Sequence, residues 1–255
     1  MLSILNLPQI SDVFDSKIKD DLEWLTCRAL EEHGVPHAFT TRRNGFGERA
    51  NGQKDHAALA RALKLDTLKT MKQVHGRDVY SIGGSDPTPV CDGMVADEPG
   101  LGVVVHTADC VPILIWAENA NAVSAVHAGW RGTLANVAAA AVEKLMADKA
   151  ASAEELHVVI GPAIRGCCFE VGDEVVKAFV DAGRDVEAIS RSGARQRRHV
   201  DLIDDNRRQL IASGVRPERI YDAGLCTVCE NERFYSYRKE GKGVGRLLGV
   251  IAVKS

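Results

Sequence analysis

The chain has 255 residues, of which 45% are hydrophobic and 26% are charged, and its formal net charge is -3. This length and apolar content allow a sizeable buried core. Both signs of charge are spread along the chain, which argues against a generally basic, nucleic-acid-binding protein. Seven cysteines are an odd number in a chain too large to need disulfide staples, so we expect thiolate chemistry rather than a disulfide framework.

Neither a leader nor a membrane-spanning segment is predicted. Met1–Ile10 lacks a positively charged start, and the apolar run Val111–Ala117 falls far short of the roughly 18 residues that span a bilayer. We therefore expect a cytoplasmic protein with neither nucleic acid nor membrane as partner. We also expect a monomer.

Helices are predicted from apolar spacing and capping residues. Apolar residues at helical intervals predict one helix over 15–32 and another over 55–65. Three more are expected further along, over 134–147 with Thr133 as its cap, over 174–180 with Asp173 as its cap, and over 204–213.

Strands are predicted where short apolar runs lie between turn residues. In chain order these runs are 38–40, 79–82, 102–106, 112–116, 122–127, 157–160 and 249–253. Strands that alternate with single helices favour an α/β class, with mixed β-sheets flanked by helices. No low-complexity linker interrupts the chain, so a single domain over 1–255 is expected. Glycine-rich dinucleotide and phosphate-loop fingerprints are absent from the sequence.

Three segments place an imidazole or a thiol where a strand should run into a turn. The residues are His75 in KQVHG, Cys110 in TADC, and His127 in AVHAGWRG. Two histidines and one cysteine leave the fourth tetrahedral position of zinc open, as in catalytic zinc sites. Taken singly, each residue also fits a turn or core role, and the spacings require convergence through the fold. Nearby glycines permit the close backbone approach that such sites use.

The ordered motifs resemble the YfiH/YlmD family, whose members were once described as polyphenol oxidoreductase laccases. The motifs run from about residue 38 to 253 and comprise KQVHG, DGMV, TADCVPIL, AVHAGWRGT, GPAI, CCFEVG, FYSYR and GVGR. The resemblance implies that His75, Cys110 and His127 bind zinc. It also implies a purine nucleoside phosphorylase that cleaves adenosine, inosine or methylthioadenosine with phosphate, with adenosine deamination as a further activity. The implied fold is similar to that of cytotoxic necrotizing factor deamidase domains.

Other polar residues are candidates for the catalytic and binding roles. We place Arg42 and Asp92 with His75, Cys110 and His127 as catalytic residues. The phosphate and nucleoside contacts would come from cationic side chains, with Arg42 first, and the candidates are Arg42, Arg131, Arg238 and Arg246. For Arg42, a surface ion pair is the alternative. Asp92 and Asp109 could shuttle protons, or could orient the ligands instead.

The sequence departs from the family pattern on the amino-terminal side of the site. The family's Thr-Arg-x-Gly-Gly-Val-Ser appears as the run from Thr41 to Gly47, and the loop that follows, at 44–54, is abbreviated. The cysteines of Cys226-x-x-Cys229 and the vicinal pair Cys167-Cys168 have no second CxxC or HxxxH partner, so we interpret them as packing residues.

Two alternatives to a zinc-dependent phosphorylase stay open. Cys110 as nucleophile and His127 as base would make an amide hydrolase, and the family is also described as editing cytoplasmic peptidoglycan precursors. A non-enzymatic metal-binding module is the third reading. Multicopper oxidation is not expected, because the chain has only eight histidines and no His-x-His pair. Cu²⁺ could still compete with Zn²⁺ for the same ligands.

Overall fold

The computed structural model describes residues 13–19, 22–44, 52–193 and 197–254. Residues 1–10, in which no leader is predicted, and residues 45–51 of the abbreviated loop lie outside the described residues. Within the described part of the chain, no helix combines the length and apolarity needed to cross a membrane.

The first sheet has six strands and is mostly antiparallel, because only β4 pairs in parallel, with β7. Its order across the sheet is β1 (Phe14–Lys19), β2 (Leu22–Cys27), β3 (His37–Thr40), β15 (Leu247–Ala252), β7 (Leu101–Thr107) and β4 (Thr67–Lys69).

The second sheet also has six strands and is likewise mixed, with β14 and β5 parallel to their neighbours. Its order is β14 (Ile220–Asp222), β10 (Leu156–Ile160), β8 (Val111–Ala117), β9 (Ala122–Ala128), β6 (Gly93–Ala96) and β5 (Val79–Ser81). A small third sheet is formed by β11 (Glu170–Val171), β13 (Arg198–Val200) and β12 (Ser190–Ser192).

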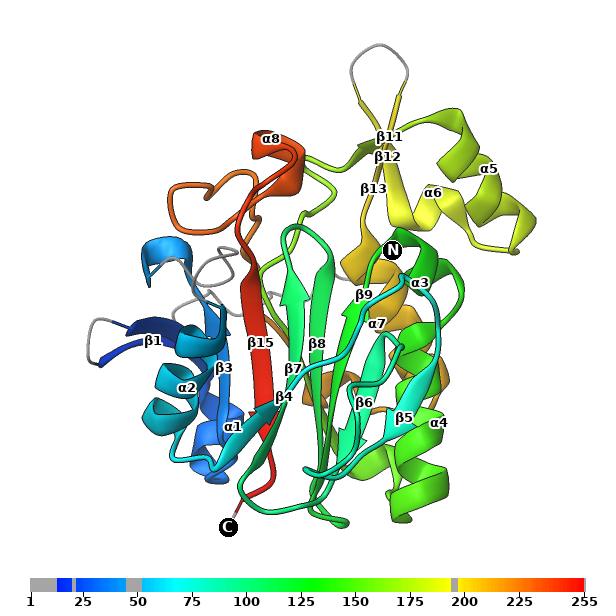
Figure 1. Cartoon of the computed structure of the whole chain (residues 1–255). Helices are drawn as coiled ribbons and strands as arrows, with labels where there is room; N and C mark the ends of the chain where they lie inside the picture. Colours follow the sequence, from blue (N-terminus) through cyan, green and yellow to red (C-terminus); the bar gives the residue numbers. More distant parts are fainter. Residues whose placement is uncertain (1–12, 20–21, 45–51, 194–196, 255) are drawn as a thin grey trace.

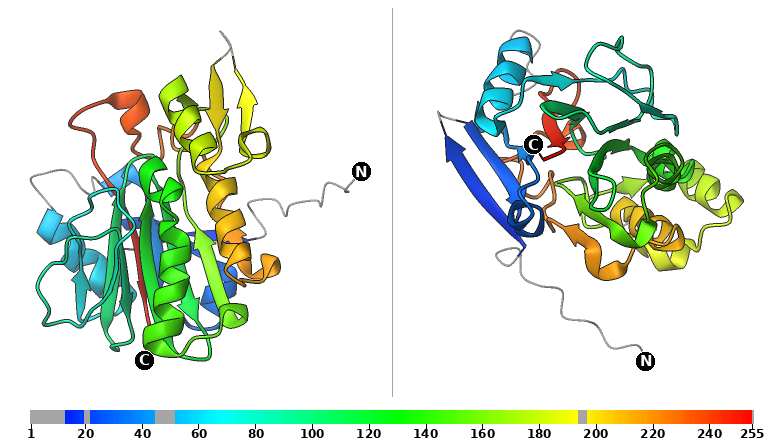
Figure 2. Two further views of the ribbon diagram at one scale, coloured as in Figure 1. Left: turned by 90° about the vertical axis from the view of Figure 1, so that its right-hand side faces the viewer. Right: turned by 90° about the horizontal axis from the view of Figure 1, so that it is seen from below.

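Helices cover the outer faces of the two large sheets (Figures 1 and 2). In chain order the α-helices are α1 (Arg28–Glu32), α2 (Gly52–Leu63), α3 (Trp130–Leu134), α4 (Val137–Lys149), α5 (Asp173–Asp181), α6 (Val186–Ile189), α7 (Leu202–Ala212) and α8 (Tyr237–Glu240). Short 3₁₀ helices are η2 (Arg42–Asn44), η3 (Ala153–Glu155) and η5 (Pro217–Arg219).

The layers follow from the alternation of side chains along the central strands. On β8, Ile113 and Ile115 pack against α4 and α7, whereas Leu114 and Trp116 point into the core between the two sheets. On β15, Val250 faces the core under α2 instead. Strands buried on both faces carry nearly continuous apolar runs, which is why the sequence marks them so clearly. The predicted α/β class with mixed, helix-flanked sheets is confirmed.

The predicted helix over 15–32 is wrong for most of its length. The segment forms the hairpin of β1 and β2, with Phe14 opposite Cys27, and only α1 is helical. Trp24 and Leu25 of β2 are both buried, on opposite faces of the sheet, because Leu25 packs in the core between the sheets and Trp24 packs in the cluster that includes Leu59 of α2. Two-sided burial removes the alternation that distinguishes a strand from a helix in sequence.

Two predicted helix caps also differ. Thr133 lies inside α3, where its hydroxyl accepts a hydrogen bond from the Asn206 amide at 2.9 Å, and α4 begins after Asn136 in the left-handed region, with φ of 64°. Asp173 is the first residue of α5, and Gly172 takes the capping position. The helix predicted over 204–213 is present as α7, which is capped by Asp201.

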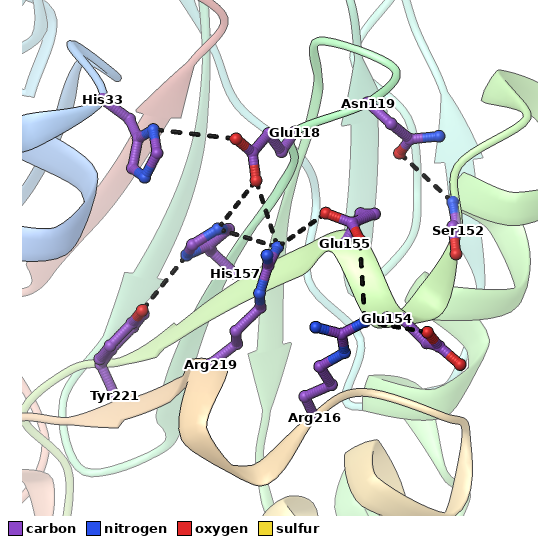
Figure 3. Close-up of polar contacts among 10 residues, drawn as sticks. All are labelled: His33, Glu118, Asn119, Ser152, Glu154, Glu155, His157, Arg216, Arg219 and Tyr221. Carbon is purple, nitrogen blue, oxygen red and sulfur yellow. Dashed lines mark hydrogen bonds and ion pairs between the residues drawn. The ribbon is translucent and has the colours of Figure 1, made fainter.

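A polar network closes the end of the second sheet, at the far end of β8 from Cys110 (Figure 3). His157 on β10 lies 3.4 Å from Glu118 and 3.1 Å from the Arg219 guanidinium, while Arg219 also pairs with Glu155. Burial, and then the charge of Arg219, lower the pKa of His157. These contacts tie η5 to the ends of β8 and β10, so we assign the network a structural role.

Candidate metal centre and cavity

The site lies at the end of the sheets where α8 is found in Figure 1, and it is built from loops that leave central strands. Cys110 ends the three-residue turn between β7 and β8, and His127 is the penultimate residue of β9. Pro112 pairs with His127 across the two strands, which brings the Cys110 turn beside the His127 ring. His75 comes from the irregular segment that follows β4.

Asp92 organises both histidines. Its carboxylate accepts hydrogen bonds from the backbone N–H groups of His75 at 2.9 Å and Gly76 at 2.7 Å, and it lies 2.8 Å from Nδ1 of His127. With Nδ1 of His127 held by Asp92, Nε2 is left to bind a ligand. Asp92 is fully buried, so it acts as a positioning residue and does not reach a substrate.

Gln73 fixes the loop that carries His75. Its side-chain amide donates to the carbonyl of His106 at 2.8 Å and accepts from the His106 N–H at 2.8 Å, so it continues the hydrogen bonding of β7. His75 itself has φ of 62°, and Asp109 beside Cys110 has φ of 93°. Backbone conformations of this kind cost energy for non-glycine residues and persist where surrounding contacts impose them.

The three predicted ligands come together. One donor atom each from His75, Cys110 and His127 lies within 4.8 Å of the others, and the Cys110 Sγ is 4.0 Å from Nε2 of His75. His127 is buried, Cys110 is half-buried and His75 is exposed, so the set opens toward solvent on one side. A Cβ at Gly129 would lie 2.8 Å from the His75 ring and 3.1 Å from the Cys110 Sγ, which explains the glycine.

Hydrogen bonds within the set change its acid–base properties. Burial alone would raise the pKa of Cys110, but hydrogen bonds from His127 and His75 outweigh it and lower that pKa to about 6. Burial alone would lower the pKa of His127, but Asp92 and Cys110 raise it to about 9. A thiolate is therefore favoured at Cys110, and a thiolate is the form that binds metals.

A cavity of about 600 Å³ opens beside the donor set. This volume is within the usual range for small-molecule sites, roughly 300–1,000 Å³. Aromatic rings of Phe169 and Tyr237 line it together with the cationic side chains Arg238 and Arg246. The cavity thus combines flat apolar surfaces with positive charge, which suits a ligand with an aromatic base and an anionic partner.

Of the predicted cationic contacts, Arg238 and Arg246 line the cavity, whereas Arg42 and Arg131 are not among its lining residues in the described chain. Arg42 forms a two-point ion pair with Glu240 at 3.1 and 3.2 Å. The contact of Arg42 with Glu240 matches the surface ion pair that the sequence allowed as the alternative to a substrate contact. Arg131 is exposed and lies over the ring of Trp130, with 4.2 Å between the guanidinium carbon and the ring centroid.

Asp109 connects the Cys110 turn to the opposite wall. Its carboxylate accepts from the Thr227 hydroxyl at 2.6 Å and from the Arg238 backbone N–H at 2.6 Å, and its carbonyl accepts from the Ile164 N–H at 2.9 Å. These contacts occupy both carboxylate oxygens, so the structure favours an orienting role for Asp109 over proton transfer.

Some residues of the site carry no sequence signal that we used. His106 lines the cavity and lies 3.3 Å from His56 of α2 between their Nε2 atoms. Burial, then the neighbouring His56, lower the pKa of His106 to about 4, so it is neutral near pH 7. The one sequence signal that could have indicated a role for His106 is that it directly precedes the TADC motif, which begins at Thr107.

The interpretation of Cys167, Cys168, Cys226 and Cys229 as packing residues fits the buried Cys226 but not the two exposed members of the group. Cys167 and Cys229 are exposed, and the four thiols of Cys167, Cys168, Cys226 and Cys229 converge within 4.8 Å of one another. The cluster was not predicted because the Cys167-Cys168 pair and the Cys226-x-x-Cys229 segment are separated by more than fifty residues, and neither is a complete metal-binding motif.

The fold and the site define a mixed α/β protein that presents an imidazole and thiol donor set at a small-molecule cavity. The family described as multi-copper polyphenol oxidoreductase laccase matches residues 36–254, and the chain belongs to that family. The YlmD protein of Geobacillus stearothermophilus, named a purine nucleoside phosphorylase, is 30% identical over 94% of this chain and 97% of its own length. Its crystal structure superposes with a TM-score of 0.84, covering 95% of this chain and 99% of that chain. The resemblance to YfiH and YlmD proteins is confirmed.

Two further relatives match a shorter segment. A purine nucleoside phosphorylase of Bacteroides thetaiotaomicron is 37% identical over 64% of this chain, and the adenosine deaminase RL5 of an unknown prokaryotic organism is 40% identical over 61%. The aligned part spans 60% and 59% of those two relatives, respectively. The prediction that the chain is an enzyme is confirmed by these relatives, against the non-enzymatic reading.

The donor set fits zinc better than it fits the copper centres in the family's description. Zinc is commonly held by histidine nitrogen and cysteine sulfur, and its catalytic sites keep one position open. Multicopper oxidation requires many converging imidazoles, and the described residues contain just two groups of three or more metal-binding side chains. Neither group has more than two histidines.

Proposed function

We propose that this chain is a zinc-dependent purine nucleoside phosphorylase of the cytoplasm, formed by one domain over 1–255, and that it cleaves adenosine, inosine and methylthioadenosine. Adenosine deamination is a further activity of the same site. The observation that carries the proposal is the convergence of His75, Cys110 and His127 beside a cavity that also holds arginines and aromatic rings. The names of the relatives support the same reaction class.

In phosphorolysis, a phosphate oxygen bonds to the anomeric carbon while the bond from that carbon to the purine nitrogen breaks, and the base leaves with the bonding electrons. Arg238 and Arg246 supply positive charge to hold phosphate in the cavity. The rings of Phe169 and Tyr237 offer faces for the purine. His75, Cys110 and His127 would hold Zn²⁺, which would supply Lewis-acid polarisation of a substrate or water oxygen.

The chain's own residues keep the donor set in place during the reaction. Asp92 holds His127 by Nδ1 and holds the backbone of the His75 loop, so both rings stay oriented when substrate enters. Gln73 restrains the same loop from the other side through β7. Restraint of this kind keeps reacting groups within the narrow range of geometry that catalysis requires.

The test is release of purine base from inosine and from adenosine, with and without phosphate, on protein whose zinc content is measured in parallel. Phosphate-dependent release that follows zinc content, with formation of a ribose phosphate, is the expected result. Conversion of adenosine to inosine without phosphate reports the deaminase activity. Zinc-loaded protein that releases no base from either nucleoside would refute the proposal.

An amide hydrolase acting on cytoplasmic peptidoglycan precursors is the second candidate. It is favoured by the chain of contacts from Cys110 through His127 to Asp92, which lowers the thiol pKa as in enzymes with a cysteine nucleophile. The two candidates respond differently to metal removal. A thiol nucleophile works without zinc and is inactivated by alkylation, whereas the phosphorylase loses activity on chelation.

A further inference from the structure

Four cysteine side chains from two distant segments gather outside the lining of the cavity, and their burial ranges from exposed to buried. Cys167 and Cys168 lie in the loop between β10 and β11, and Cys226 and Cys229 lie after β14. All four Sγ atoms are within 4.8 Å of one another. The Sγ of Cys229 lies 3.7 Å from the Sγ of Cys167 and 3.4 Å from the Sγ of Cys168.

The spacing matches the edges of a zinc tetrahedron. With Zn–S bonds of about 2.3 Å, the edge between two sulfur ligands is about 3.8 Å. Cys229 has two sulfur neighbours near this distance, and a disulfide, whose sulfurs are about 2.05 Å apart, could join it to only one of them. Two disulfides would use the four thiols in pairs, whereas a single tetrahedral ion is bound by all four at once, and the separations of 3.4 and 3.7 Å are near the tetrahedral edge.

We propose that Cys167, Cys168, Cys226 and Cys229 bind one Zn²⁺ ion as a second metal site, separate from the donor set at the cavity. Four thiolates form a closed coordination shell without an open position, which is the arrangement of structural zinc sites. Sulfur ligands of this kind also bind iron. A cluster with bridging sulfides would hold the four thiolates farther apart than a single ion does, so the compact group selects one ion.

The site would lock the wall of the cavity that carries Arg238. The carbonyls of Cys168 and Glu170 accept hydrogen bonds from the Arg238 guanidinium at 3.3 and 2.9 Å, and Phe169 between them lines the cavity. The guanidinium carbon lies 5.2 Å from the centre of the Phe169 ring. Arg238 therefore depends on the segment that follows the cysteine pair.

The second cysteine segment contacts the turn that carries Cys110. Thr227 lies between Cys226 and Cys229, and its hydroxyl donates to Asp109, the residue before Cys110. One ion bound by both segments joins positions 62 residues apart, and so fixes two walls of the cavity relative to each other. Metal binding that orders separate segments contributes directly to folding.

The first experiment is the zinc content of the full chain, measured by mass spectrometry of the metal, on protein purified in reductant without chelator. Two equivalents of zinc per chain are expected. The Cys229→Ser variant should lose one equivalent, while Cys229→His should retain it, because imidazole also binds zinc in tetrahedral sites. Cys229 is exposed, so neither substitution removes buried packing.

The second experiment separates the two sites by spectroscopy after replacement of zinc with Co²⁺. A tetrathiolate site gives intense thiolate charge-transfer bands, which should disappear in Cys229→Ser and persist in Cys110→Ser. Cys110→Ser should lose the other equivalent of metal. If instead Cys110→Ser keeps all its metal while Cys229→Ser loses one equivalent, the cavity site fails and the tetrathiolate site stands.

Three results would overturn the second site. The first is Cys229→Ser with the metal content and cobalt spectrum of the wild type. The second is iron in place of zinc in the purified protein. The third is peptide mapping that finds Cys229 in a disulfide after the reductant is removed and the wild-type protein is exposed to air in the presence of excess zinc, because oxygen should not oxidise thiolates that hold the ion.

Discussion

Replacing Gly129 with alanine should damage the metal centre without damaging the fold. The new Cβ would lie 2.8 Å from Cδ2 of His75 and 3.1 Å from the Sγ of Cys110. Favourable contacts between carbon atoms lie at about 3.5–4.0 Å, so the His75 ring must withdraw by roughly 0.7 Å or more. The backbone of Gly129 has φ of -71° and ψ of 171°, which alanine adopts freely, so the strain falls on the ligands.

The magnitude follows from the narrow tolerance of metal sites. Bond lengths to zinc vary by only about 0.2 Å, and displacing groups that orient ligands costs about 10- to 100-fold in affinity. That loss corresponds to about 1.4–2.8 kcal/mol of binding free energy. The free energy of unfolding of the metal-free protein should change by less than about 1 kcal/mol, since alanine also reduces the entropy of the unfolded chain.

Competition with a chromophoric chelator measures the zinc affinity, and urea unfolding of the metal-free protein measures stability. Gly76→Ala is the matched control, because its Cβ would meet Asp92 at 3.6 Å and Val74 at 3.7 Å, which are ordinary contacts. Zinc affinity in Gly129→Ala equal to that of the wild type would refute the assignment of His75 and Cys110 as ligands.

Three other perturbations follow from the same structure. In Asp92→Asn, the side-chain NH₂ group would face one of the backbone N–H groups that the carboxylate now accepts from, so two donors would meet. The zinc affinity measured by chelator competition should therefore fall about 10- to 100-fold. An unchanged affinity would show that Asp92 does not position the ligands. Arg238→Ala should raise the phosphate KM by about 10-fold or more while the exposed Arg131→Ala leaves it unchanged, and equal effects in steady-state kinetics would contradict the assignment of Arg238. The ring of His37 accepts a hydrogen bond from the Cys27 N–H at 2.7 Å, and burial lowers the pKa of His37 below 6.5. The unfolded chain therefore binds this proton more readily than the folded protein does. The free energy of unfolding should thus be highest above about pH 6.5 and should fall as the pH drops from there toward the folded-state pKa of His37. The difference between the urea midpoints at about pH 7.5 and about pH 5.5 should be smaller in His37→Asn than in the wild type. The same difference in both proteins would contradict this account.

The sequence by itself indicated the central strands, and its resemblance to a known family indicated the donor set. The strands β7, β8, β9 and β10 are buried on both faces, so their apolar runs are visible in the sequence and predict strands. Cys110 lies just before β8, and His127 lies near the end of β9. A strand that ends in a fixed register places its last side chains in a fixed position. Local pattern therefore placed Cys110 and His127 at the ends of strands, and the family resemblance indicated that they are metal ligands.

Tertiary structure decided what depends on partners distant in the chain. Arg42 is bound by Glu240, nearly two hundred residues later, and no local pattern distinguishes that ion pair from a substrate contact. The hairpin of β1 and β2 was hidden because β2 is covered on both faces by layers formed later in the sequence. The convergence of Cys167 with Cys229 likewise arises only when β10 and β14 pair in parallel, which brings the segments after the two strands together.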